Sequence, residues 1–147
     1  MAVRKGDQEQ GKLTAIDASR LLISYTYDRV HDKTLPKTDR WLITKTIWDD
    51  ASKARQYIII ANSIKVENRE EAEDRIFKEK LAIGHLDSLA ASLDVLHIKG
   101  IISDDRMDYW SKLVTDTQNL TKGLMKANKT AYKRFLKEDN NQREQTT

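Results

Sequence analysis

Residues that break helices are scarce in this chain of 147 residues, and their positions constrain the fold more than any other feature of the sequence. The chain contains one proline, Pro36, and five glycines. The turn signals lie between long segments in which apolar residues recur every three or four positions, whereas strands would need turns every eight to twelve residues. The sequence therefore predicts an all-α protein.

Four amphipathic segments are expected to be helical, and they span residues 12–31, 39–64, 69–99 and 104–137. Pro36 cannot continue a helix from Leu35, so it separates the first segment from the second. Thr38 is expected to cap the second helix, and Asn68 with Glu71 forms the asparagine version of a capping box for the third. These caps leave only short connections between the helices.

Short connections between helices of this length favour an up-down-up-down antiparallel four-helix bundle. Gly100 suits the C-terminal cap of the third helix, and Ser103 opens the fourth. We expect one bundle domain over residues 12–137, a flexible N-terminal segment over residues 1–11 and a polar C-terminal tail over residues 138–147. The expected core face of the fourth helix contains Trp110, Leu113, Thr117, Leu120, Leu124, Ala127, Ala131 and Phe135.

Composition favours a cytoplasmic protein. The sequence has no run of about 18 apolar residues that would span a bilayer, and residues 1–12 lack the apolar centre of a secretory signal. The absence of cysteine excludes disulfides and thiolate metal sites and fits a reducing compartment. We therefore expect no membrane association and no cofactor.

The second helix is apolar on more than one side. On a helical wheel, Trp41, Trp48 and Ile59 lie roughly 100 to 120° from the expected core stripe. These residues are predicted to form a self-association surface, because two tryptophans seven residues apart are costly to leave in water. The main alternative is that a wide arc of this helix is buried between two neighbouring helices of the same bundle. A third interpretation is that the tryptophans stack on nucleic-acid bases.

Basic residues dominate the segment from residue 119 to residue 137, which contains no acidic residue. Five lysines follow one another at intervals of 4, 3, 4 and 4, which places them within an arc of roughly 80° on a helix. A face of one charge sign is typical of an anionic partner, and lysine suits backbone phosphates better than base edges. A merely solubilising face is the alternative. The predicted nucleic-acid-binding residues are Lys122, Lys126, Lys129, Lys133, Arg134 and Lys137.

Catalytic motifs are absent from the sequence, and we expect no enzyme. The only arrangement with metal-site spacing consists of two Asp–His pairs, Asp28 with His31 and Asp94 with His97. Di-metal bundles use glutamate at the acidic position and add a glutamate from each of the other two helices. The pairs are better interpreted as polar residues at helix ends, where a histidine cation is favoured by the helix dipole.

The stretch LPKTDRW, residues 35–41, resembles the four-helix-bundle superfamily that includes proteins encoded in intervening sequences of 23S rRNA genes. Within it, Ile60-Ala61-Asn62, the leucine-rich third helix and IISDDRMDYWSKLVTDTQNLTKGL, residues 101–124, are more similar to the accessory variability determinant proteins of diversity-generating retroelements. The resemblance covers roughly residues 15–130. A Gly-Gly-Trp that often ends the family pattern corresponds here to Lys122, Gly123 and Leu124, so only Gly123 matches.

The resemblance implies a homopentamer of four-helix protomers without catalytic activity. Such a protein binds the reverse transcriptase and the template RNA or its cDNA, and it supports mutagenic retrohoming. The subunit number and the polymerase partner rest on the resemblance only. A self-assembling bundle of the 23S rRNA intervening-sequence type, with a structural role and no nucleic-acid function, is the alternative.

Overall fold

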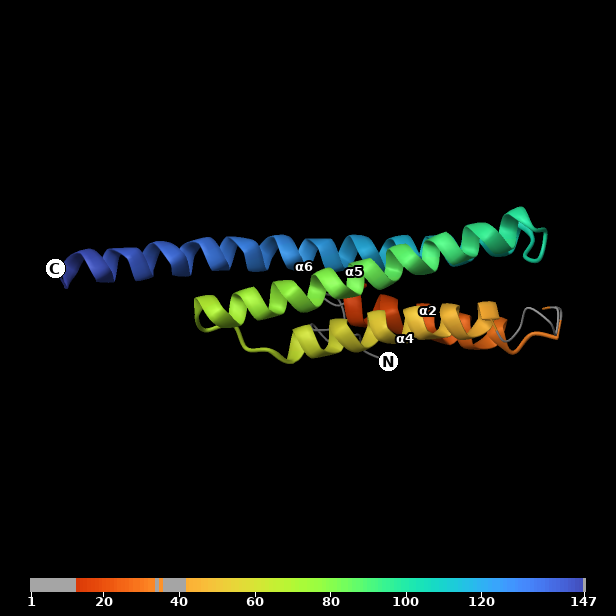
Figure 1. Ribbon diagram of the computed structural model, residues 1–147, viewed down its shortest axis with the longest axis horizontal. Coiled ribbons are helices and arrows are strands. Elements are labelled where there is room, and N and C mark those ends of the chain that lie inside the picture. Colours follow the sequence, from red (N-terminus) through yellow and green to blue (C-terminus); the bar gives the residue numbers. More distant parts are fainter. Residues whose placement is uncertain (1–12, 34, 36–41, 147) are drawn as a thin grey trace, which may run out of the picture.

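The computed structural model describes residues 13–33, 35 and 42–146. It contains four helices, α2 (Ala15–Val30), α4 (Leu42–Ser63), α5 (Arg69–Ile98) and α6 (Asp104–Gln145). Each helix runs antiparallel to the one before it, as Figure 1 shows. The predicted all-α four-helix bundle is confirmed.

Side-chain and backbone caps end the helices where the sequence predicted them. The Asn68 carboxamide oxygen accepts a hydrogen bond from the Glu71 amide at 2.9 Å, and Ser103 Oγ accepts one from the Arg106 amide at 3.3 Å. Gly100 has a φ of 71°, and its amide donates to the His97 carbonyl, while the Ile101 amide donates to the Leu96 carbonyl. This pair of bonds is a Schellman motif, which satisfies carbonyls at the end of α5.

The helices pack in a closed cycle in which α2 and α5 lie on one diagonal and α4 and α6 on the other. The core at the centre of this cycle combines four leucines of α5 with Trp110 of α6. Trp110 is 1% exposed, and its indole N–H donates to Thr26 Oγ1 of α2 at 3.1 Å. The largest side chains of this core are Leu22, Ile47, Leu86, Leu89, Leu93, Leu96 and Trp110.

The four helices differ greatly in length, from 16 residues in α2 to 42 in α6. As a result, the C-terminal part of α6 extends past the ends of the other helices (Figure 1). We expected this helix to end near Lys137 and a polar tail to follow, but α6 continues to Gln145. The expectation was wrong in this respect because the segment has good helix formers and no proline or glycine.

The buried face of α6 also differs from the expected one near its C-terminal end. Ala127 is exposed, whereas Asn128 is 8% exposed and Thr121 is fully buried. Leu120, Leu124, Ala131 and Phe135 are only half-buried, while Trp110, Leu113 and Thr117 are buried as expected. The short α2 leaves this half of α6 with fewer neighbours, so its apolar residues are covered from one side.

Several expectations concern residues outside the part of the chain that the structure describes. These are the flexible segment 1–11, the proline turn at Pro36, the cap at Thr38 and the position of Trp41. The helix that follows them is described from Leu42 onward.

By length and composition alone, α5 is the one described helix that is long and apolar enough to cross a bilayer, and 28% of its apolar stretch is buried inside the bundle. Its leucines at positions 86, 89, 93 and 96 are buried in the bundle core. Core helices often pass the same test. The fold is therefore compatible with a soluble protein.

The central core should be sensitive to truncation. Leu93 is fully buried, so Leu93→Ala is expected to lower the free energy of unfolding by about 2–5 kcal/mol. Leu21 of α2 is 48% exposed and serves as the control, because Leu21→Ala is expected to cost less than about 1 kcal/mol. Urea denaturation followed by circular dichroism measures both, and equal losses would contradict this description of the core.

Candidate nucleic-acid interface

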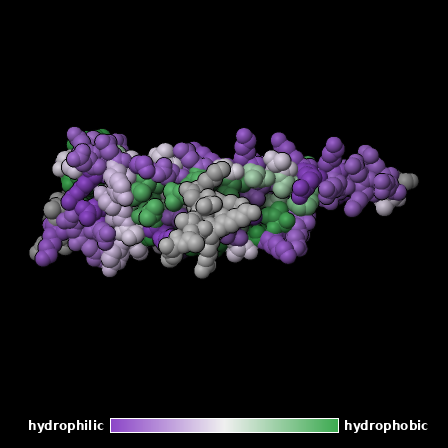
Figure 2. Space-filling view, turned by 180° about the vertical axis from the view of Figure 1, so that it is seen from behind, coloured by the Kyte–Doolittle hydropathy of each residue, from purple (hydrophilic) through white to green (hydrophobic). Residues whose placement is uncertain are grey.

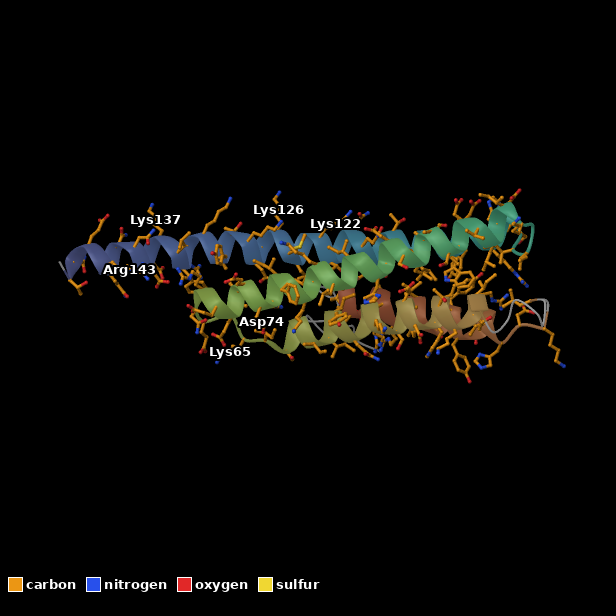
Figure 3. The ribbon with its side chains drawn as sticks, viewed as in Figure 1. Lys65, Asp74, Lys122, Lys126, Lys137 and Arg143 are labelled. Carbon is orange, nitrogen blue, oxygen red and sulfur yellow. The ribbon has the colours of Figure 1, made fainter. Side chains whose placement is uncertain are left out.

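A stripe of basic side chains runs along the outer face of α6, and it contains the six residues that the sequence predicted. All six are exposed, and none forms an ion pair with any residue of the described chain. In Figure 3, Lys122, Lys126 and Lys137 point away from the other helices. We call this surface the basic stripe; it comprises Lys122, Lys126, Lys129, Lys133, Arg134 and Lys137.

The lysines point outward because the opposite side of α6 is held against α5. Asn128 Nδ2 donates hydrogen bonds to both carboxylate oxygens of Glu79 on α5, at 2.8 and 3.0 Å. Thr121 lies two turns earlier on the same side and is fully buried. These contacts fix the rotation of α6, and the lysines at intervals of three and four must then face solvent.

Several charges elsewhere on the bundle lie beside opposite charges. Lys112 lies 3.2 Å from Asp116 on α6 itself, and Lys78 lies 3.7 Å from Asp74 on α5. On the basic stripe, the guanidinium of Arg134 instead lies 5.0 Å from the Phe135 ring centre. In the view of Figure 2, the end of α6 that projects beyond the other helices is mostly hydrophilic. The basic stripe is therefore a surface of uncompensated positive charge.

The length of the basic stripe suits a polyanion. Lys122 and Lys137 are fifteen residues apart, which corresponds to about 22 Å along an α-helix. Lysine ammonium groups interact with phosphates as point charges. They lack the planar, forked donor arrangement with which arginine forms paired hydrogen bonds to base edges. The stripe can therefore hold a nucleic-acid backbone with strong salt dependence and little sequence preference.

The Glu79–Asn128 contact was missed at the sequence level. Glu79 is 1% exposed, and burial raises the pKa of its carboxyl above the usual value, while the hydrogen bond from Asn128 and the charge of Arg75 act in the opposite direction. In the sequence, Glu79 stands among other charged residues and therefore resembles a residue exposed to solvent. The one signal in the sequence was that Glu79 stands three residues from Ile76 and three from Ala82, which places it on the same side of the helix as these two buried residues.

The structure describes two of the three residues predicted for self-association. Trp48 is half-buried, and its ring centre lies 5.9 Å from that of Tyr27 on α2 in an edge-to-face arrangement. Ile59 is 41% exposed. Between them, Arg55 donates to the Ile16 carbonyl of α2 at 3.2 Å. Part of this side of α4 is therefore covered by α2, as the alternative interpretation required, and Ile59 remains accessible.

The two Asp–His pairs are not brought together as a metal site. The His31 imidazole Nδ1 lies 2.7 Å from the Tyr27 carbonyl oxygen, and His97 Nε2 lies 2.6 Å from Asp104 on α6. Among the described residues, no group of three or more potential ligands from histidine, aspartate and glutamate comes together.

His85, which has no partner in the sequence pattern, is held between α4 and α5. Its Nδ1 lies 3.0 Å from Asp50 Oδ1, and Ser88 Oγ donates to Asp50 Oδ2 at 2.7 Å. The Tyr57 ring stacks on the imidazole with the ring centres 5.8 Å apart. The Asp50 carboxylate accepts hydrogen bonds from both His85 and Ser88. Ser88 is therefore bonded to a carboxylate and has no histidine beside it to act as a base. The cluster joins two helices and has no nucleophile arrangement.

Comparison of the sequence with models of known protein families gives no match, and comparison with curated proteins gives none either.

Replacement of the buried carboxylate should change how stability depends on pH. Because the folded-state pKa of Glu79 is raised, its ionisation opposes folding, and this cost grows as pH rises from the unfolded-state pKa through the folded-state pKa. Glu79→Gln keeps the shape and removes the charge. The variant is expected to gain stability relative to the wild type as pH increases across that window, by at most about 1.4 kcal/mol per pH unit.

Urea denaturation of both proteins between pH 4 and pH 8 measures this difference. Exposed Glu73→Gln on the same helix is the matched control and should show no such trend. A stability difference for Glu79→Gln that does not vary with pH would show that the carboxyl titrates normally.

Proposed function

We propose that this protein binds the phosphate backbone of RNA through the basic stripe of α6. The observation that carries the proposal is the exposure of six basic side chains along α6, none of which forms an ion pair with a described carboxylate. A solubilising surface would tolerate acidic residues among the basic ones, and residues 119–137 contain none. The projecting position of α6 also leaves room for an extended polyanion.

We further propose that the RNA is the template of a diversity-generating retroelement, or the cDNA copied from it. In this role the protein is a non-catalytic cytoplasmic accessory factor that binds the element's reverse transcriptase and supports mutagenic retrohoming. The support is the resemblance of residues 35–41, 60–62 and 101–124 to the accessory variability determinant proteins. The polymerase partner rests on that resemblance.

The assembly proposed from the same resemblance is a ring of five chains, about 85 kDa or five times the 17.0 kDa of one chain. A ring needs two different surfaces on each chain, because its contacts are heterologous. We propose that Ile59, Trp48 and Trp41 belong to one of these surfaces. The accessible Ile59 supports this assignment.

The basic stripe is tested by the double variant Lys126→Glu/Lys133→Glu. We expect its affinity for a structured RNA to fall about tenfold or more at low salt, because two phosphate contacts become repulsions. The slope of log affinity against log salt should also become shallower by about 1–2 units. Fluorescence anisotropy with labelled RNA at several salt concentrations measures both quantities.

The matched control is Lys45→Glu/Lys53→Glu, two exposed lysines of α4 that change the net charge equally. An equal loss of affinity in this control would mean that only total charge matters. An unchanged affinity in the α6 variant would refute the proposed interface and favour the purely structural alternative.

The assembly surface is tested by Ile59→Glu. Ile59 is exposed in the single chain, so the variant should fold, but a carboxylate in an apolar contact is expected to lower the mass measured by light scattering. The adjacent Ile60 is 43% exposed and points to another side of α4, which makes Ile60→Glu the matched control. A mass that changes only in the control would show that the contact lies elsewhere on α4.

A further inference from the structure

The outer face of α5 carries an uncharged ridge that is mostly exposed, although its Ser88 donates a hydrogen bond to Asp50 of α4. Six of its residues follow one another at intervals of 4, 3, 4, 3 and 4, and they are Phe77, Leu81, Gly84, Ser88, Ala91 and Val95. On a helix these positions share one side, opposite the core leucines. Phe77 is 55% and Val95 50% exposed, and Ile98 continues the spacing with 72% exposure. We call this surface the α5 ridge.

The composition of α5 shows that this ridge is an exception to ordinary solvated faces. The helix is apolar enough over eighteen residues to resemble a membrane span, yet only 28% of that stretch is buried inside the bundle. A helix that buries one face normally places charged residues on the other. Here the charges lie at the edges of the ridge, with Lys80 and Asp94 on the edge nearer to α6.

Gly84, near the middle of the ridge, has no role within the single chain that would require a glycine. A Cβ atom added there would meet nothing within 4 Å, and the residue lies in regular helical structure. Glycine in a helix interior is less favourable than alanine. Small residues at the centre of a ridge do, however, allow the backbone of another helix to approach closely.

We propose that the α5 ridge packs antiparallel against the α5 ridge of a second copy of this chain. Apolar residues at alternating intervals of three and four are the pattern by which two helices pack knobs into holes. With Gly84 opposite Ser88 of the second copy, Phe77 lies opposite Val95, and Leu81 lies opposite Ala91. The bulky residues of one copy then meet smaller residues of the other, and the smallest residues meet at the centre.

Charge at the edge of the ridge selects a second copy in this orientation. Lys80 and Asp94 are exposed, and neither forms an ion pair with a described residue of its own chain. The antiparallel pairing places each Lys80 near Asp94 of the other copy, twice in each pair. In a parallel pairing this edge would meet the opposite edge of the second copy, so Lys80 and Asp94 would not meet each other.

Asp87, midway between them, lies near Asp87 of the second copy in the antiparallel pairing, one like-charge contact against the two Lys80–Asp94 contacts. Its carboxylate accepts a hydrogen bond from Gln118 of α6, which draws it toward its own bundle. The pairing is two-fold and therefore separate from the heterologous ring contact proposed at Ile59. It also leaves the basic stripe uncovered.

Cysteine cross-linking tests the pairing, since the chain has no cysteine of its own. In the double variant Lys80→Cys/Asp94→Cys, oxidised glutathione should link two chains through residues 80 and 94, giving a band of about 34 kDa, twice 17.0 kDa, that dithiothreitol removes. The two positions are fourteen residues apart, about 21 Å on one helix, so they cannot link within one chain. Each single variant should remain largely monomeric on the gel.

The control Ala127→Cys/Asn141→Cys has the same separation on exposed positions of α6 outside the basic stripe and should give at least tenfold less cross-linked product. Efficient linking of Lys80→Cys alone would overturn the antiparallel orientation. Failure of all variants to link would overturn the second-copy assignment, and sedimentation of the wild type with phosphatidylcholine vesicles would then assign the ridge to a lipid surface. RNA affinity of the variants is measured in parallel, so a failure of this pairing is distinguishable from a failure of the proposed RNA binding.

Discussion

Leu86, Leu89, Leu93 and Leu96 of α5 lie between α4 and α6 with at most 1% exposure, and their burial determines where the other helices lie. A fully buried leucine contributes about 1.5–3 kcal/mol relative to an exposed one. Trp110 closes this core from α6, and its bond to Thr26 ties α2 into the same layer. The rotation of each helix about its own axis follows from these contacts, and with it the identity of every outward face.

Unequal helix lengths divide the bundle into two parts that pack differently. Where α2 is present, four helices surround a leucine-rich centre; beyond the beginning of α2, α6 packs mainly on α5 through the polar Glu79–Asn128 contact (Figure 1). A buried carboxylate such as that of Glu79 contributes little to stability, but it needs a hydrogen-bond partner in a suitable position, and here that partner is Asn128. That requirement sets the orientation of α6 at the point where the basic stripe begins.

The basic stripe, the Ile59 side of α4 and the α5 ridge lie on different sides of the bundle and do not overlap. The basic stripe faces outward on α6, the side of α4 with Ile59 lies toward α2, and the α5 ridge lies on the diagonal opposite α2. The proposed polyanion binding and the proposed contacts between copies therefore do not exclude one another. Multiple copies would present several basic stripes to one nucleic acid, which strengthens binding through effective concentration.

The sequence by itself determined the number of helices, the caps of α5, the N-cap of α6 and most of the α4 and α5 core, because periodicity and capping act within one helix. It also located the basic stripe, since lysine spacing depends only on helical geometry. Tertiary structure decided that Ala127 is exposed and Asn128 buried, because that depends on where α5 lies. It likewise decided the partners of Glu79, His85 and Trp48, all from other helices. Contacts between segments far apart in the chain leave no local pattern from which they could be predicted.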